Sequence, residues 1–330
     1  MMKLAHRFTV LATVLACSLP AHAATLIEVW VSRTGTDNGT CGDWTTPCQS
    51  FIGALPRVTA GGQINVMDAG DFGFAEITKS VSIVNATSGT AASVSDATVI
   101  PGGPVANVII VAGANGVVTL RGLVLNTATT GGPVGSLGVL INNASQVNIE
   151  NCLIMNNSLG GIEVVPSTAG LSQTLATSIN VNIQDSTITG NAGGIKIAPT
   201  TVTPINVVID KTRINNNPGG GIKADGTSGG PITVSMSDSL ISLNSGNGVN
   251  AVGQSNNVII NLNNDVIASN GTSGIQANGA DAAVLVSNTS ILDNTTGATS
   301  AIGGGRVLTY GNNRIVGTAG SGFTGPAPLQ

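Results

Sequence analysis

The sequence predicts an all-β protein: a single-stranded right-handed parallel β-helix, or solenoid, with a small N-terminal cap. Two observations lead to this fold class. Apolar residues recur in a fixed pattern along the chain, and Asn, Asp and Gly residues recur at the positions between them. The composition agrees, because the 330 residues include 45 Gly and few charged or aromatic residues, while Val, Ile and Thr are frequent throughout.

Residues 1–23 have the pattern of a secretory signal peptide. A basic start, an apolar stretch too short to span a bilayer and small residues at a cleavage site follow in order: Lys3 and Arg7, Phe8 to Leu19, and Ala21 to Ala23. We expect cleavage near Ala23 and a secreted protein, periplasmic or extracellular. The alternative is a lipoprotein anchored at Cys17, because residues 14–17 loosely resemble a lipobox.

Removal of this segment changes what the chain can do. Both histidines, His6 and His22, lie within it, so every histidine-based triad and metal site is excluded from the mature chain. Loss of Lys3 and Arg7 makes the remainder more acidic than the net charge of −4 for all residues, which argues against a nucleic-acid partner. No later apolar run approaches the roughly 20 residues of a membrane span.

The repeat is anchored on segments of the form Val-x-Ile. The anchors are Val118, Val147, Val181, Val207, Val234, Ile260, Val284 and Leu308. The residue two positions later is apolar in each repeat: Leu120, Ile149, Ile183, Ile209, Met236, Leu262, Val286 and Tyr310. So is the residue seven positions later: Leu125, Ile154, Ile188, Ile214, Ile241, Ile267, Ile291 and Ile315.

These offsets predict three short strands in each turn of the coil. An anchor and the residue two later share one face of a strand, because side chains alternate with a period of two. The residues five and seven positions after an anchor share a face of a second strand. The alternation of inward and outward side chains therefore shifts by one residue between the two strands, and a tight turn must separate them. A third apolar strand starts at Ile162, Ile195, Ile222, Val249 and Ile275.

Two polar columns mark the corners. A structural Asn/Asp ladder stands four residues after the anchors, where Asn and Asp tolerate a left-handed backbone: Asn151, Asp185, Asp238, Asn264, Asn288 and Asn312, with Lys211 and Gly122 in the same column. A second Asn ladder stands ten residues after the anchors: Asn157, Asn191, Asn217, Asn244, Asn270 and Asn294.

Three cysteines remain after the signal peptide. Export favours disulfides, and Cys41 and Cys48 are the natural pair. Cys152 falls five residues after its anchor, in a column of mostly small inward residues, so we expect a buried cysteine rather than a reactive thiol. Asp265 and Asn313 fit that column poorly, and we expect a local adjustment of the turn there.

The chain divides into four segments. Residues 1–23 are the signal peptide, 24–60 form an N-terminal cap with the disulfide loop and a short helix near Gln49–Leu55, 61–316 form the β-helix, and 317–330 form a flexible tail. The longest excursions from the repeat, at 126–136 and 165–178, are candidate binding loops or simply solvated loops.

The repeat written Val-x-Ile-x-x-Cys-x-Ile-x-x-Asn, over Val147 to Asn157, resembles the pectin-lyase-like superfamily of right-handed parallel β-helices. The termini resemble those of secreted bacterial right-handed β-helix repeat proteins of unassigned activity: Val31 to Cys48 with Phe51 to Gly73, and Tyr310 to Ile315. The superfamily includes polysaccharide lyases and hydrolases, tailspikes and adhesins, so the resemblance implies a fold and no single function.

We predict no catalytic set and no metal site. The polygalacturonase-like pattern needs an Asp-Asp pair, a Gly-His-Gly and an Arg-x-Lys, and none of these occurs after residue 23. Two outward columns form a speculative ligand-binding face: Arg121, Glu150 and Asp210 in one, and Glu163, Lys196 and Lys223 in the other. The alternative is a thinly charged solvent-exposed surface.

Two functions remain open. In the first, the protein is a secreted, non-catalytic β-helix that binds a glycan or another cell-surface component, or serves a structural or adhesive role. In the second, it is a divergent polysaccharide lyase or glycoside hydrolase that acts on an acidic polysaccharide, and only this alternative would involve Ca²⁺ as a cofactor. The scarcity of aromatic residues, on which sugars usually stack, favours the first. The oligomeric state does not follow from the sequence.

Overall fold

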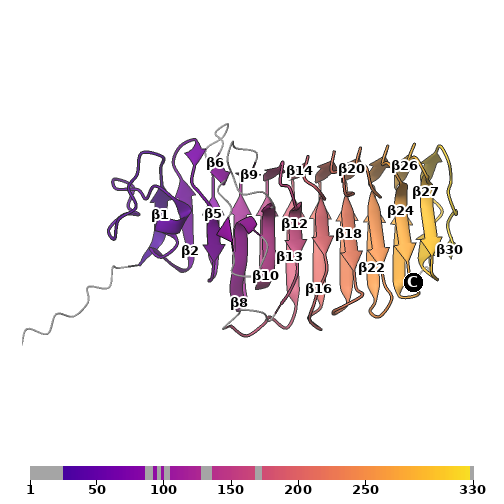
Figure 1. The fold of residues 1–330 in the computed structure, drawn as a ribbon, viewed down its shortest axis with the longest axis horizontal. Coiled ribbons are helices and arrows are strands. Elements are labelled where there is room, and N and C mark those ends of the chain that lie inside the picture. The colour runs from indigo at the N-terminus through magenta and orange to yellow at the C-terminus, as the bar shows by residue number, and fades with distance from the viewer. Residues whose placement is uncertain are drawn as a thin grey trace, which may run out of the picture.

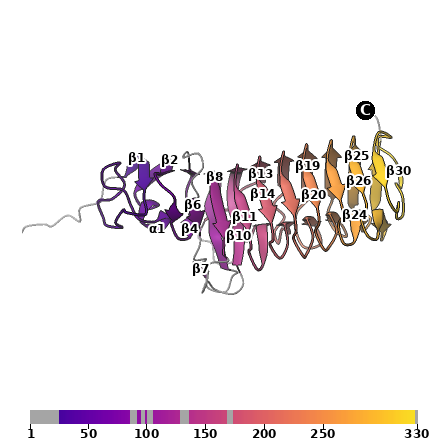
Figure 2. The ribbon, with the colours of Figure 1, turned by 90° about the horizontal axis from the view of Figure 1, so that it is seen from above.

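The computed structural model describes residues 25–327 apart from 86–91, 95–97, 100–104, 128–135 and 168–172. The expected signal peptide and the lipoprotein alternative at Cys17 lie outside the described residues. The described part is a rod of stacked strands, with the cap at one end and the C-terminal strands at the other (Figure 1). A view from above shows successive turns following one another along the same axis (Figure 2).

The strands form three faces of one coil. Face 1 contains β1 (Leu26–Val31), β2 (Val58–Val66), β5 (Val81–Val84), β13 (Ile179–Gln184), β16 (Ile205–Asp210), β19 (Ile232–Ser237), β22 (Val258–Asn263), β25 (Ala282–Ser287), β28 (Arg306–Thr309) and β30 (Gly325–Pro326). Face 2 contains β3 (Gly70–Asp71), β6 (Ala92–Val94), β9 (Leu123–Asn126), β11 (Leu153–Met155), β14 (Thr187–Thr189), β17 (Arg213–Asn215), β20 (Leu240–Ser242), β23 (Val266–Ala268), β26 (Ser290–Leu292) and β29 (Arg314–Val316).

Face 3 contains β4 (Ala75–Ile77), β12 (Gly160–Val164), β15 (Ile195–Ile197), β18 (Ile222–Asp225), β21 (Val249–Val252), β24 (Ser273–Asn278) and β27 (Gly297–Ile302). Two long strands, β8 (Val105–Arg121) and β10 (Ser136–Glu150), run from face 3 around the corner onto face 1. Pairing between turns is parallel throughout these faces, and the short β7 (Thr98–Val99) is antiparallel to β8. This arrangement confirms the predicted parallel β-helix.

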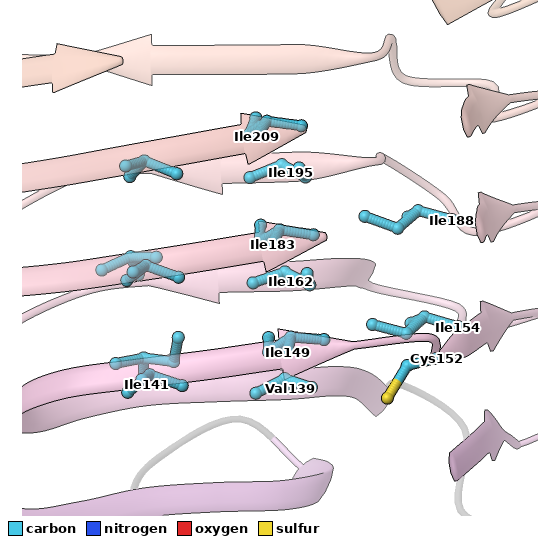
Figure 3. Packing of buried hydrophobic residues seen from close by; sticks show 14 of the residues in the cluster. Val139, Ile141, Ile149, Cys152, Ile154, Ile162, Ile183, Ile188, Ile195 and Ile209 are labelled. Carbon is cyan, nitrogen blue, oxygen red and sulfur yellow. The ribbon is translucent and has the colours of Figure 1, made fainter. Parts of the chain in front are cut away.

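The expected apolar columns fill the interior. Val147, Val181 and Val207 are in register across β10, β13 and β16, and all three are buried. Figure 3 shows two neighbouring columns that point into the coil: Ile149, Ile183 and Ile209 from bottom to top, and Ile154 below Ile188. Each column removes one aliphatic side chain per turn from water, so the buried apolar surface area increases with every turn added along the axis.

The last turn departs from the expected register. Val307, not Leu308, pairs with Val284, and the next inward position is Thr309. Tyr310 is therefore exposed rather than part of the core. The physical reason is an extra residue in the corner, where Gly311 has a φ of 87°, before Ile315 rejoins its column beside Ile291.

Both ends of the coil extend past the expected boundaries. At the N-terminus β1, placed in the cap by the sequence, pairs in parallel with β2 and is the first strand of face 1. At the C-terminus, residues 317–327, expected as a flexible tail, add part of another turn: Thr299 bridges to Gly320, and β30 pairs with β28. The half-buried Phe323 packs against the core at this end.

The N-terminal cap closes the other end. The predicted disulfide between Cys41 and Cys48 is present, and the short helix α1 (Phe51–Ala54) begins after Ser50, whose side chain accepts a hydrogen bond from the Gly53 N–H. The Phe51 and Phe72 rings, both buried, lie 5.5 Å apart over the first turns of the coil. A covered end removes an open sheet edge that would otherwise pair with other chains.

Candidate functional site

The second Asn ladder lies at the corner between faces 2 and 3, and we call it the amide column. Each member donates its backbone N–H and its side-chain Nδ2 to the Oδ1 of the next member. For Asn217 these two bonds to Asn244 are both 3.0 Å long. A further bond joins Asn217 Nδ2 to the Ile188 carbonyl, and the side chain is fully buried. The same pattern runs from Asn157 to Asn294.

This column requires glycine beside it. One inward glycine lies in the turn before each amide: Gly138, Gly161, Gly194, Gly221, Gly248 and Gly274. A Cβ on Gly161 would lie 2.6 Å from Cγ2 of Ile188 and 3.2 Å from Nδ2 of Asn191. There is no room for a methyl group, so the amide column and the glycine column depend on each other.

A second glycine precedes the first in three successive turns and creates the candidate site. These glycines are Gly160, Gly193 and Gly220; a Cβ on Gly193 would meet no atom within 4 Å, whereas a Cβ on Gly220 would lie 2.9 Å from the Asn247 carbonyl oxygen. The missing side chains leave a trough along the coil axis with a volume of about 300 Å³. Leu137 and Leu159 line it at one end and Asn247 at the other. At about 4.8 Å per turn, the floor from Leu137 to Asn247 extends roughly 19 Å.

Charged side chains from neighbouring strands line one side of the trough. Glu163, Lys196 and Lys223 are paired in register across β12, β15 and β18. Lys196 Nζ lies 2.5 Å from Glu163 Oε1, and Lys223 Nζ lies 2.9 Å from Asp225 Oδ2. Glu163 is the one acidic side chain among the described lining residues, and Asp225 lies beside Lys223, so each lysine of this wall is paired with one carboxylate.

Asp225 positions one of these lysines. Its Oδ1 accepts hydrogen bonds from the backbone N–H and the hydroxyl of Thr227, which fixes the carboxylate next to Lys223. Burial acts to raise the pKa of Asp225, but hydrogen bonds from Lys223 and Thr227 outweigh burial and hold that pKa below its usual value. The carboxylate is therefore ionised, and it orients the Lys223 ammonium.

Asn250 supplies an unsatisfied acceptor beside the lysines. It is in register with Lys223 on β21 and lines the trough. Its Oδ1 atom is buried and accepts no hydrogen bond from the described residues. A buried carbonyl oxygen without a donor costs about 1–3 kcal/mol, so Asn250 is held at this position at some cost to stability.

The structure separates the two columns that the sequence suggested as one ligand-binding face. Glu163, Lys196 and Lys223 lie together on face 3 at the trough. Arg121, Glu150 and Asp210 lie on face 1, where Arg121 pairs with Glu150 at 2.5 Å and Lys211 lies 3.4 Å from Asp210. These face 1 carboxylates are held in ion pairs and line no part of the trough.

The Asn/Asp ladder lies at the exposed corner between faces 1 and 2. Asn151, Asp185, Lys211, Asp238, Asn264 and Asn288 have positive φ of 46–59°, whereas Asn312 does not. Side-chain hydrogen bonds join parts of the column, from Asn264 to Asp238 and from Asn312 to Asn288. No such bond joins Asn151 to Asp185 among the interactions found in the described residues, so this column is held by backbone conformation more than by an amide chain.

Several lining residues were not predicted: the outward glycines, Leu137, Leu159, Asn247 and Asn250. A signal for the floor is visible in the sequence, because Gly-Gly-Ile occurs at 160–162, at 193–195 and at 220–222. Only the paired register shows that the first glycine of each triplet points outward and the second inward.

Potential metal ligands gather elsewhere. Within the described ranges, Asp37, Cys41 and Cys48 are the group close enough to share an ion, and both thiols are consumed in the disulfide. The remaining described cysteine, Cys152, is buried, and burial raises the pKa of its thiol to about 11. No described helix is long and apolar enough to cross a membrane.

Comparison with known proteins places the coil in a family. Residues 77–265 match the family model described as the right-handed β-helix region. The chain belongs to the right-handed β-helix family. No curated protein sequence matches it significantly.

Two solved structures are similar to this chain. A pectate lyase, Pel9A, is similar over 92% of this chain and 79% of its own, at 11% identity and a TM-score of 0.51. A lacto-N-biosidase from Eubacterium ramulus is similar over 87% of this chain and 67% of its own, at 12% identity and a TM-score of 0.48. The pectate lyase confirms the resemblance to pectin-lyase-like β-helices, and at this identity it shows the fold alone.

Proposed function

We propose that this protein is a non-catalytic β-helix that binds an acidic glycan along the trough on face 3. The trough itself supports the proposal. Its glycine floor leaves room for a chain of sugar rings, and its Lys196 and Lys223 ammonium groups suit carboxylates. The elongated floor matches a linear polymer running parallel to the coil axis.

The lining gives no support to hydrolysis by a pair of carboxylates. Most glycosidases place two acidic side chains on either side of the bond they cleave. Glu163 is the single carboxylate among the described lining residues, and it is paired with Lys196. A lyase or hydrolase therefore remains the alternative function, and assays for product formation distinguish it from binding alone.

Binding is tested by calorimetry with oligogalacturonate and alginate oligomers, each with and without Ca²⁺, and with neutral oligomers of equal length. We expect the acidic oligomers to bind, and Lys223→Gln to weaken binding about tenfold through loss of one charge-assisted contact. Gly193→Leu fills the open floor and should abolish binding. Lys211→Asn removes the same charge at a distant corner and keeps a residue suited to positive φ, so it should bind normally.

Two results would contradict this proposal. Equal binding of acidic oligomers by Gly193→Leu and the unaltered protein would show that the trough is not the site. Formation of new unsaturated or reducing ends, lost in Glu163→Gln, would favour the enzymatic alternative.

We also propose that the protein is exported with residues 1–23 removed. The pattern of those residues and the Cys41–Cys48 disulfide support export, because such bonds persist in oxidising compartments. Mass spectrometry of the protein from its native host should find an N-terminus at residue 24. An intact Met1 would contradict export by this route, and a lipid-modified Cys17 would favour the lipoprotein alternative.

A further inference from the structure

A column of small side chains lies inside the corner between faces 1 and 2, and we call it the corner column. Its members are Cys152, Ser186, Thr212, Ser239, Asp265, Thr289 and Asn313. Each hydroxyl accepts a hydrogen bond from the N–H of the member one turn earlier, as Ser239 does from Thr212 at 3.0 Å. Each hydroxyl also donates to the carbonyl two residues before it, as Ser239 does to Ser237 at 2.7 Å.

Asp265 is the one carboxylate in this column, and it does not make the second of these bonds, the donation to the carbonyl two residues before it. Its Oδ1 accepts the Ser239 N–H at 2.9 Å, so the bond between turns is kept. Its Oδ2 accepts the Asn263 N–H at 3.0 Å, where the neighbouring hydroxyls instead donate to a carbonyl. Only 1% of the residue is exposed. An ionised Asp265 has no proton to donate, so it places a buried negative charge in a column of hydroxyl donors.

The surroundings do not neutralise this charge. The corner one turn earlier carries Asp238, and the corner before that carries Asp210 and Lys211, with Lys211 Nζ close to Asp210. The following corner contributes the uncharged Asn288 and Thr289. None of the ion pairs found in the described residues includes Asp265.

We propose that Asp265 is a proton-binding site that makes the packing of turns β19 to β26 depend on pH. When protonated, it is uncharged like the neighbouring hydroxyls and still has the oxygen that accepts the Ser239 N–H. When ionised, it leaves an uncompensated charge between tightly stacked turns and loosens them.

The direction of this dependence follows from the pKa. Burial raises the pKa of Asp265 to about 7, against the opposing hydrogen bonds from the Ser239 and Asn263 N–H groups, while the ordinary value is 3.8. Since the folded state binds the proton more tightly than the unfolded chain, the protonated form stabilises the fold fully below about pH 4. That stabilisation decreases as the pH rises and is lost above about pH 7.

The test measures stability at pH 5 and pH 8 at one ionic strength. Because His6 and His22 are the only histidines in the sequence, the full chain carrying His6→Gln and His22→Gln has no imidazole that titrates in this window. We expect the Tm of this protein to fall by roughly 5 °C between pH 5 and pH 8. We also expect amide hydrogen-exchange protection in β19–β25 to fall about a hundredfold, after correction for intrinsic exchange rates.

The matched variant is Asp265→Ser, which places in the column the residue found at 186 and 239. Its Tm and its exchange protection should be nearly equal at pH 5 and pH 8. Asp238→Asn removes a nearby exposed carboxylate and keeps a residue suited to positive φ, so the midpoint of the pH effect should move to lower pH. The proposal is overturned if the histidine-free protein shows no loss of Tm or protection by pH 8. It is equally overturned if Asp265→Ser shows the same loss.

Discussion

The amide column contains only asparagine from Asn157 to Asn294, whereas the corner column of the same turns contains cysteine, serine, threonine, aspartate and asparagine. Both columns are buried and both connect successive turns through side-chain oxygens. They differ in what each position must supply. Every amide receives hydrogen bonds from the turn before and gives them to the turn after, while a corner residue needs one acceptor and a small volume.

This difference explains why some columns of the coil tolerate fewer residue types than others. A side chain in the amide column must carry a donor and an acceptor at the reach of asparagine, because its neighbours on both sides depend on it. The corner column accepts small side chains with oxygen or sulfur, and even a carboxylate in Asp265, because each side chain makes one bond between turns and its other bond is local. The uniform amide column therefore stabilises the coil, whereas the mixed corner column can include residues with other properties, such as Asp265.

The largest expected effect compares the two columns within one turn. Asn217→Ser should lower the free energy of unfolding by about 4 kcal/mol, because the Asn191 N–H, the Asn191 amide and the Ile188 carbonyl lose their partner. Thr212→Ser keeps both hydroxyl bonds, from the Ser186 N–H and to the Asp210 carbonyl, and should lower it by less than about 1 kcal/mol. Urea unfolding followed by circular dichroism measures both. Similar losses in the two variants would contradict the distinction between the columns.

A smaller effect is expected from the glycines that accompany the amide column. A Cβ on Gly221 would lie 2.6 Å from Ile241 Cγ2 and 3.3 Å from Asn244 Nδ2, so Gly221→Ala should destabilise the fold by about 2 kcal/mol. Gly193→Ala points into open space and should leave the urea midpoint nearly unchanged. If Gly221→Ala is as stable as Gly193→Ala, the inward glycines are not needed for the amide column.

The smallest effect concerns the exposed position just before an amide. Leu243 precedes Asn244, has a φ of 56° and is 57% exposed, while Asn156 and Asn216 hold the equivalent positions with similar backbone. Leu243→Asn should raise the free energy of unfolding by about 1 kcal/mol, because asparagine tolerates the left-handed conformation better than leucine. Val266→Asn, at an exposed strand position with an ordinary backbone, is the control and should give no such gain. A decrease in stability for Leu243→Asn would show that the leucine makes a contact that outweighs its strain.

The inward part of the fold was predictable because it repeats with the period of the side chains. Val-x-Ile segments and the apolar residue seven positions on could be assigned to strands from the sequence, as could Cys152 in the corner. The predicted register was wrong at Tyr310, because one extra residue near Gly311 shifts the last turn. No local pattern in the sequence marks this insertion.

The candidate site was only partly predictable. Glu163, Lys196 and Lys223 could be aligned because each follows a glycine pair, but Arg121, Glu150 and Asp210 were grouped with them although they lie on another face. A trough whose floor is formed by glycines contains no distinctive side chain that could be recognised as a binding residue in the sequence. Asn250 was missed because its importance depends on an oxygen left without a partner, which only the packed structure reveals.

The amide column also has a direction. From Asn157 to Asn270, each asparagine donates its backbone N–H to the asparagine of the turn that follows it, and none of these bonds between asparagines runs the other way. The Nδ2 group also donates to a main-chain carbonyl of the preceding turn, as Asn217 does to Ile188. A partly synthesised coil therefore always ends in one turn whose amide awaits an acceptor, and the next turn to emerge supplies that acceptor. Assembly that proceeds from the N-terminal cap outward leaves at most one such turn incomplete at a time. The order in which the chain is made is thus also the order in which its interior becomes complete.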